Sequence, residues 1–229
     1  MTNQSTSGIL HPMQESARLR HERPNNSRTG DPREAIFQAA CTVMRRKGFH
    51  QARISDIAAE AGISYGLVYH YFKNKAHLLD AIIEEWWNGL YEAMGESEDG
   101  SKPVETRLMG IVDYFLDQYR ARPDLVHVFI TEISRSTANL TPARLGRFKR
   151  FFDETEHVIS LAQQQGVLRN DIKARYLTYM FVGALESFVS ALVLENQPLR
   201  GDAQKKRIAS SIVEVFFNGA RAGQAIGLK

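Results

Sequence analysis

Apolar residues recur at the three- and four-residue spacing of α-helices from Asp31 onward, and this periodicity constrains the fold more than any other feature of the chain. No segment alternates between apolar and polar residues as a half-buried strand does. Asp31 before Pro32 and Thr141 before Pro142 each combine an N-cap with a proline in the first helical turn. The sequence therefore predicts an all-α fold.

The signals for helix starts and stops divide this pattern into short N-terminal and longer C-terminal segments. We expect helices over residues 32–47, 54–61, 65–72, 75–94, 103–120, 124–136, 142–165, 171–195 and 204–221. The first three are close enough in sequence to form a compact module, and the others are long enough to form a larger helical body.

Positive charge is concentrated near the N-terminus. Residues 1–80 hold 11 Lys and Arg against 7 Asp and Glu, whereas residues 81–229 hold 18 against 19. Residues 1–30 show no apolar periodicity and are rich in Ser, Asn, Gln and Pro, which predicts a mobile tail. The tail is basic through Arg18, Arg20, Arg23 and Arg28. This excess permits nucleic-acid binding without proving it, and the tail is either an inert extension or a further contact to such a partner.

Motifs typical of enzymes and membrane proteins do not occur. The single cysteine, Cys41, excludes an internal disulfide and is expected as a small core or flank residue rather than a reactive thiol. The chain has no H-E-x-x-H zinc pattern, Cys/His cluster, G-x-S-x-G elbow or Walker loop. No apolar run reaches about 18 residues, and the N-terminus has no basic start followed by an apolar stretch. We expect a cytoplasmic protein with no cofactor, metal, catalytic site or membrane contact.

The most informative stretch is SDIAAEAGISYGLVYHYFKNKAHLL, which runs from Ser55 to Leu79. Ala58 allows a second helix to approach closely, and Gly62 can adopt the left-handed conformation that a sharp helix end needs. Ser64 can then cap the next helix. Two short helices joined by such a turn predict a helix-turn-helix unit, which places its second helix in the DNA major groove.

The second short helix has two different faces. Val68 and Phe72 are four residues apart and are expected to point inward. The opposite face carries aromatic, small and hydrogen-bonding residues, namely Tyr65, Gly66, Tyr69, His70 and Lys73. Each alone fits an ordinary surface position, but their combination at fixed spacing favours a DNA-reading face.

This stretch resembles the TetR/AcrR family signature of D-I-A, A-G-[IV]-S, a Gly two residues on, Y-x-Y-F and a Lys three residues later. The matching segments are Asp56–Ala58, Ala61–Ser64, Gly66, Tyr69–Phe72 and Lys75. The resemblance covers Arg33 to Leu79, and the later residues share only the number and length of helices. It implies a helix-turn-helix DNA-binding domain followed by a larger helical ligand-binding and dimerisation domain.

The resemblance also implies which residues contact DNA. The matching positions are Ser64, Tyr65 and Gly66 at the groove, Tyr69, Tyr71 and Lys75 at phosphates, and His70 at a base or a phosphate. One departure concerns the position before the first short helix, where the family has Thr or Ser and this chain has Ala52 and Arg53. Arg53 can supply a phosphate contact, but the lost side-chain cap would cost roughly 1 kcal/mol unless something replaces it.

The expected domains are a mobile basic tail over 1–30, a DNA-binding domain over 31–76 and an effector-binding and dimerisation domain over 77–229. Helices 171–195 and 204–221 carry small and apolar residues: Tyr179, Gly183, Ala184, Ser187, Ala191, Ile208, Ile212, Val215, Phe216 and Gly219. These helices either form a four-helix interface in a homodimer or pack inside one chain. A homodimer suits a palindromic operator in double-stranded DNA.

The resemblance further implies a cavity for a small-molecule effector in the aromatic-rich body. The expected lining residues are Tyr114, Phe129, Phe152, Phe181 and Phe188. Acidic residues are few on the apolar faces there, with Glu132 and Glu186 as exceptions. We therefore expect a largely apolar effector, fatty acyl or aromatic, that releases a repressor from its operator, with helix 75–94 as the lever.

Two other functions fit parts of the sequence: an all-helical enzyme and a protein-interaction module that does not bind DNA. The closest candidates for metal or acid–base catalysis are Asp113 with Asp117, and Glu154 and Glu156 with His157. Such pairs are more typical of solvated helix faces. The Tyr and Lys residues of the signature favour DNA binding over both alternatives.

Overall fold

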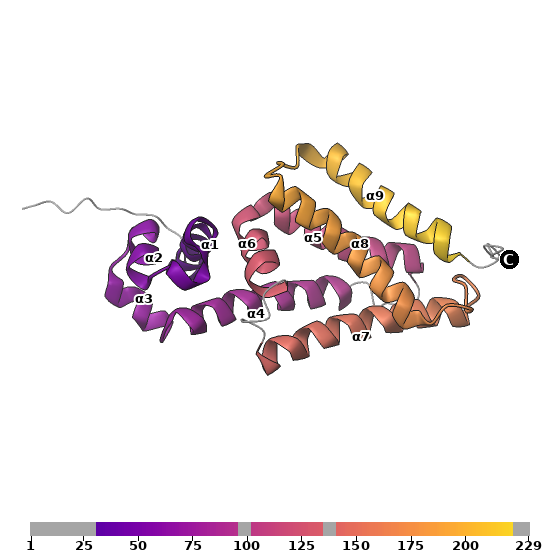
Figure 1. Cartoon of the computed structure of the whole chain (residues 1–229), viewed down its shortest axis with the longest axis horizontal. Helices are drawn as coiled ribbons and strands as arrows, with labels where there is room; N and C mark the ends of the chain where they lie inside the picture. The colour runs from indigo at the N-terminus through magenta and orange to yellow at the C-terminus, as the bar shows by residue number, and fades with distance from the viewer. Residues whose placement is uncertain (1–30, 96–101, 135–140, 222–229) are drawn as a thin grey trace, which may run out of the picture. The chain divides into compact units, whose positions relative to one another are not determined.

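The computed structural model describes residues 31–95, 102–134 and 141–221. Within them every regular element is helical, as Figure 1 shows, which confirms the predicted all-α fold. The elements are α1 Pro32–Gln51, α2 Ile54–Ala61, α3 Tyr65–Tyr71, α4 Lys75–Gly95, α5 Val104–Ala121, α6 Pro123–Val128, the π-helical η1 Phe129–Ser134, α7 Pro142–Gln164, α8 Ala174–Leu194 and α9 Gly201–Ala220. The expected tail, with Arg18, Arg20, Arg23 and Arg28, lies outside the described residues.

Helix α1 begins at the residue that the sequence indicates but ends later than expected. The Asp31 carboxylate accepts a hydrogen bond from the Arg33 backbone N–H at 2.9 Å, so it is the predicted N-cap. Gly48 has φ +76°, which breaks the regular helix, and one further turn continues to Gln51. The glycine therefore introduces a kink where we expected the helix to end.

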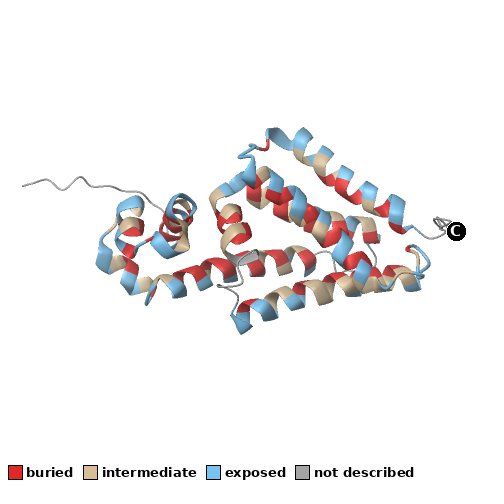
Figure 2. Cartoon of the chain, viewed as in Figure 1, coloured by how far each residue is buried: buried red, intermediate tan, exposed pale blue. Residues whose placement is uncertain are grey.

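One continuous core joins the three N-terminal helices to the body (Figure 2). Its N-terminal part contains Ile36, Val43, Ile57 and Val68, all fully buried. Helix α4 carries the same core onward because it buries residues along its whole length, among them Trp86 and Trp87. No gap in the core marks the predicted boundary between residues 76 and 77, which stays a prediction.

Helix α5 is central to the body and packs against α4, α6, α7, α8 and α9. Its buried face includes Leu108, Val112, Phe115 and Leu116, spaced as an amphipathic helix requires. Helix α6 packs against α1, so the body also contacts the N-terminal module away from α4.

The expected helix 124–136 is instead a short α-helix followed by a π-helical turn. The consecutive residues Val128, Phe129 and Ile130 are all buried at this transition. A π-helical turn has i→i+5 hydrogen bonds and so rotates less per residue than an α-helix, which spreads these three side chains over a narrower arc.

The start of α8 also differs from the expectation, at Ala174 rather than residue 171. The segment before α8 pairs with the end of α9. The Arg169 N–H donates to the Ala220 carbonyl at 2.8 Å, and Leu168 forms an isolated antiparallel β-bridge with Arg221. Helix α9 begins at Gly201, three residues before the expected start.

Helix α8 is long and apolar enough, by length and composition, to cross a membrane, although its longest uninterrupted apolar run is short. Only 44% of its most apolar window is buried within the chain. It packs on α5, α6, α7 and α9 with its buried face. The opposite face of α8 is also apolar but is not covered by the described part of this chain. A partner protein or a lipid bilayer would provide the apolar surroundings that such a face favours.

Candidate nucleic-acid interface

The turn between α2 and α3 has the geometry of a helix-turn-helix unit. Gly62 has φ +67°, and its N–H bonds to the Ala59 carbonyl at 3.2 Å. Ser64 caps α3, since its Oγ accepts the Leu67 N–H at 3.3 Å. On the inner side, Ala58 and Val68 are buried where the two helices meet. The turn thus holds α3 at a fixed angle with its other face in solvent.

The outer face of α3 is aromatic and exposed. Tyr65 and Tyr69 are 53% and 43% exposed, and their hydroxyls hydrogen-bond to each other at 3.2 Å. His70 is exposed beside them. A Cβ atom added to Gly66 would meet no other atom within 4 Å, so the helix surface there is open. Tyr71 is half-buried against Phe72 and so is less available. The predicted residues Ser64, Tyr65, Gly66, Tyr69 and His70 therefore share one open surface.

Arg53 lies at the start of α2, where the missing side-chain cap has a replacement. The Asp56 carboxylate reaches back to accept the Arg53 backbone N–H at 3.1 Å. Lys47 Nζ lies 2.8 Å from Asp56 Oδ2, and this hydrogen bond lowers the pKa of Asp56 below its ordinary value. The Arg53 guanidinium forms no hydrogen bond or ion pair with a side chain among the described residues, and it borders an open surface hollow with Lys47 and His50.

The ammonium of Lys75 is bound within the protein, whereas the resemblance implies that it contacts a DNA phosphate. Its ammonium donates to the carbonyl oxygens of Phe49, His50 and Ala52 at 2.5, 2.9 and 2.9 Å. It also lies 4.6 Å above the Phe49 ring. Partial burial lowers its pKa. All three donor hydrogens are used, so in this conformation Lys75 ties the start of α4 to the end of α1 and has no donor for a phosphate. Spacing along the sequence could not reveal which carbonyls lie opposite.

A polar contact connects the N-terminal module to the body at α6. Asp124 accepts hydrogen bonds from Thr42 Oγ1 at 2.7 Å and from Arg45 Nη1 at 2.6 Å. Burial raises the pKa of Asp124, but these two hydrogen bonds outweigh it and the net shift is downward. Nearby, Glu132 of η1 accepts the Phe49 N–H at 3.2 Å. The segment α6–η1 therefore holds α1 through two carboxylates.

The structure brings together only two of the five residues expected at an effector cavity. Phe129 and Phe152 line an aromatic cavity of about 30 Å³ with Trp87, Phe115, Phe148, Phe151 and Glu186. Trp87 is its centre, with ring centroids 5.5 Å from Phe129 and 4.9 Å from Phe148. We call this the aromatic cavity. The many aromatic residues in the sequence indicated an aromatic cavity, but they did not indicate which of the rings would line it.

The other three residues lie elsewhere for clear reasons. The Tyr114 hydroxyl donates to the Trp86 carbonyl at 2.7 Å on a different side of α4. Phe181 is fully buried against Phe216, with ring centroids 5.3 Å apart. Phe188 is 37% exposed on the outer face of α8. A helical sequence pattern distinguishes buried from exposed faces but not one buried side from another.

Helix α8 presents an apolar stripe to solvent. Its exposed side chains include Tyr176, Tyr179, Met180, Phe188 and Leu194, and the small residues Ala184, Ser187 and Ala191 lie between them. The expected stripe on α9 divides differently, because Ile212 is buried and only Val215 and Gly219 of that set are exposed. The candidate contact surface is therefore mainly α8.

Within residues 31–95, 102–134 and 141–221, no three His, Cys, Asp or Glu side chains gather to hold a metal ion. Cys41 is buried, and burial together with the charge of Asp124 raises the pKa of its thiol to about 12. Its position in the core is as predicted.

Two family models match the chain. Residues 36–82 match the bacterial regulatory proteins of the tetR family, and residues 80–215 match the C-terminal region of YsiA-like proteins, which is more than half of the chain. Among curated relatives, the fatty acid metabolism regulator protein of Bacillus subtilis is 23% identical over 80% of this chain and 93% of its own length. The HTH-type transcriptional repressor SCO4008 of Streptomyces coelicolor is 30% identical over 64% of this chain and 72% of its own.

Solved structures show the same fold. The fatty acid degradation regulator FadR of Bacillus halodurans matches with a TM-score of 0.72 and 22% identity, over 83% of this chain and 96% of that one. FadR of Bacillus subtilis, solved in complex with stearoyl-CoA, matches with a TM-score of 0.70 and 22% identity, over 81% and 98%. AibR, solved with isovaleryl coenzyme A and operator DNA, matches with a TM-score of 0.65 and 21% identity, over 82% and 98%. Together with the family models, the helix-turn-helix geometry shows that this chain belongs to the tetR family of bacterial transcriptional regulators.

Proposed function

We propose that this chain is a homodimeric repressor that binds a two-fold symmetric operator through α3 and is released by an acyl effector. The outer face of α3 carries this proposal. Tyr65, Tyr69 and His70 direct hydrogen-bonding groups to solvent, and α3 has no acidic residue that would repel phosphates. Gly66 leaves room for close approach of a DNA backbone or base.

The DNA-contacting residues follow from exposure and from free donors. We assign Ser64, Tyr65 and Gly66 to the groove, Tyr69 and His70 to the groove edge, and Arg53 to a phosphate. Tyr71 contributes less because it is half-buried. Lys75 positions the module by holding the end of α1, rather than binding a phosphate directly.

The dimer forms through the exposed apolar stripe of α8. An apolar surface of this length is unfavourable in water, and a second copy of α8 would cover it. Small residues such as Ala184 and Ala191 allow close helix approach. Two recognition helices would then meet successive major grooves about 34 Å apart.

The effector class is supported by the aromatic cavity and by the relatives. An acyl chain requires apolar walls, which Trp87, Phe129 and Phe152 supply. The Bacillus subtilis relative regulates fatty acid metabolism, and two matched structures hold acyl-coenzyme A molecules. The aromatic cavity is small, so an acyl chain must displace side chains when it enters.

This displacement can reach the DNA-binding module through α6–η1. Phe129 lines the aromatic cavity, whereas Asp124, five residues earlier, holds Thr42 and Arg45 on α1. A shift of Phe129 therefore moves the segment that holds α1, and α4 connects the same two regions. We propose that the effector changes the spacing of the two α3 helices by this route.

The test is fluorescence anisotropy of a labelled duplex taken from DNA upstream of the chain's own gene. We expect specific binding that weakens when stearoyl-CoA is added and does not change with coenzyme A alone. Arg53→Ala should lower the slope of log affinity against log salt by about one per protomer, since one phosphate contact is lost. Arg200→Ala is the matched control, because Arg200 is also exposed but follows α8, away from α3.

Absence of any duplex that binds more tightly than random DNA would contradict the proposal and favour a protein-interaction module. Equal salt slopes for the wild type and Arg53→Ala would remove Arg53 from the interface without affecting the remainder.

A further inference from the structure

A second cavity lies between α4, α5 and α7. Its volume is about 210 Å³, and its apolar wall is formed by Met94, Ile111 and Val158. Arg107 of α5 also lines it. We call this the Arg107 cavity. It is larger than the aromatic cavity, and unlike the aromatic cavity it is lined by a buried cation.

Arg107 is a buried cation without a partner in the described part of the chain. The residue is only 6% exposed, and its Nε atom is enclosed without any hydrogen-bond acceptor. The guanidinium forms no ion pair with any described carboxylate. A buried unpaired charge is strongly unfavourable, so proteins rarely keep one that only fills space. Its presence on a cavity wall indicates that an anion from outside the chain completes it.

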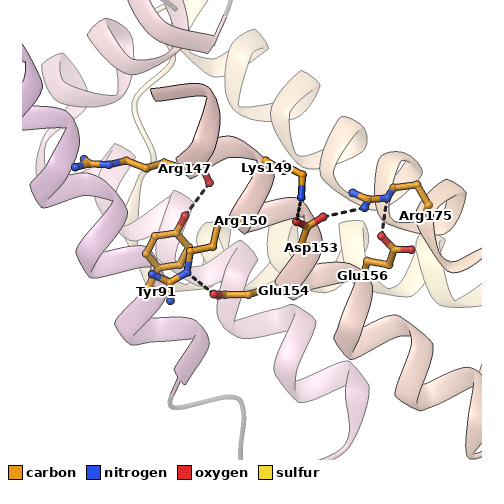
Figure 3. A network of polar contacts seen from close by, with 8 residues as sticks. All are labelled: Tyr91, Arg147, Lys149, Arg150, Asp153, Glu154, Glu156 and Arg175. Carbon is orange, nitrogen blue, oxygen red and sulfur yellow. Dashed lines mark hydrogen bonds and ion pairs between the residues drawn. The ribbon is translucent and has the colours of Figure 1, made fainter. Parts of the chain in front are cut away.

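The carboxylates near this cavity are already neutralised, as Figure 3 shows. Asp153 pairs with Lys149 at 2.6 Å and with Arg175 at 2.8 Å. Glu154, which also borders the cavity, pairs with Arg150 at 2.5 Å.

The same network extends along α7. Arg175 also pairs with Glu156, at 2.5 Å, and Arg150 stacks over the Tyr91 ring at 4.0 Å. Lys149, Arg150 and Arg175 thus balance Asp153, Glu154 and Glu156 one for one (Figure 3). The charge of Arg107 is additional to this balanced set, so the cavity favours an anion.

The two cavities follow the same helices. Ile111 lines the Arg107 cavity, and Phe115, one turn further along α5, lines the aromatic cavity. On α7, Phe152 of the aromatic cavity directly precedes Asp153 of the Arg107 cavity. A molecule with an apolar chain and an anionic group can therefore place each part against walls of matching chemistry.

We propose that Arg107 binds the anionic group of the effector and so selects amphiphilic anions over neutral apolar molecules. This inference rests on the proposed acyl effector and adds the recognition of charge. The anion is a carboxylate or a phosphate. Both groups present a pair of negatively charged oxygens that a guanidinium can bind through two parallel hydrogen bonds. A free fatty acid would supply the first and an acyl-coenzyme A the second.

The test compares the full-length wild-type protein with Arg107→Met by thermal unfolding and by isothermal titration calorimetry without DNA. The ligands are decanoate, decanoyl-CoA, coenzyme A and the neutral decanol. We expect Arg107→Met to raise the melting temperature of the ligand-free protein, because it removes an unpaired buried charge at similar volume. We also expect at least tenfold weaker binding of the preferred anionic ligand and unchanged binding of decanol.

Arg120→Met is the matched control. Arg120 is on the same helix, but it is exposed and paired with Asp202. This variant should leave the binding of all four ligands unchanged. In the wild type, preference for decanoate over decanoyl-CoA identifies the anion as a carboxylate, and the reverse preference identifies it as a phosphate.

Two results would overturn the inference while leaving the proposed function in place: equal binding of the anionic ligand by the wild type and Arg107→Met, or a destabilised variant that loses all ligands equally. If the wild type binds none of the acyl ligands, the acyl-effector proposal fails as well. Anisotropy on the same preparation then shows whether DNA binding is retained.

Discussion

Lys75→Met is a sharp test of how the DNA-binding module is held together. The substitution keeps most of the side-chain length but removes the ammonium that donates to the carbonyls of Phe49, His50 and Ala52. These carbonyls lie at the end of α1, where the helix cannot satisfy them itself. The variant should therefore loosen the contact between α1 and the start of α4 without removing a DNA contact.

The expected loss of stability is moderate. A hydrogen bond from a charged donor contributes about 1.5–3 kcal/mol where both groups are desolvated. Lys75 is only partly buried, and water can replace the ammonium at these carbonyls. We therefore expect a loss of about 2 kcal/mol for the whole cluster rather than three times the single value. For a chain of this size that lowers the melting temperature by about 4–8 °C.

The assay combines thermal unfolding by circular dichroism with DNA binding across a salt series at a temperature where the variant is folded. Lys73→Met is the control, because Lys73 is exposed on the outer side of the same region and its ammonium contacts no described residue. Lys75→Met should lower the melting temperature and keep the wild-type salt slope. Lys73→Met should keep the wild-type melting temperature, because its ammonium has no contact among the described residues to lose.

The opposite outcome for Lys75→Met would refute this reasoning. An unchanged melting temperature with a salt slope lowered by one would mean that Lys75 leaves the carbonyls of α1 and binds a phosphate in the complex.

Three further predictions follow from single contacts. Gly62→Ala should destabilise the protein by roughly 1–2 kcal/mol in denaturant unfolding, through backbone strain alone, because a Cβ there meets no atom within 4 Å. Asp124→Asn should lower the free energy of unfolding by about 1–2 kcal/mol at pH 7. Because folding lowers the pKa of Asp124, the wild type should hold this advantage fully above about pH 4 and lose it as the pH falls through the lowered pKa. Cys41, the single cysteine, should resist alkylation at pH 8 in the native protein and react fully in denaturant, as its pKa of about 12 requires.

Local signals in the sequence were sufficient for most of the fold. Capping residues such as Asp31 and Thr141 act through neighbours two or three positions away, so their effect is visible in the sequence itself. Gly62 and Ser64 likewise define the turn before α3 by short-range hydrogen bonds. The π-helical turn was missed because apolar periodicity does not distinguish one turn with i→i+5 hydrogen bonds from an α-helix.

The candidate sites depend more on contacts between distant residues. The exposed face of α3 could be predicted because helical periodicity separates Tyr65 and Tyr69 from Val68. The partners of Lys75 lie more than 20 positions away and follow no local pattern. For the same reason periodicity located the aromatic residues in the body but could not choose Phe129 over Phe181 as a cavity residue. Arg107 gives no sequence signal, since only the fold shows that it is buried without a partner.

The most direct test of ligand-responsive repression is reciprocal binding of one acyl effector and one operator duplex. Affinity for decanoyl-CoA is measured on the free dimer and on the dimer saturated with its specific DNA, and DNA affinity is measured with and without the effector. The two ratios must be equal, and we expect at least tenfold, a coupling of about 1.4 kcal/mol. Specific DNA binding with the same effector affinity in both states would contradict the account.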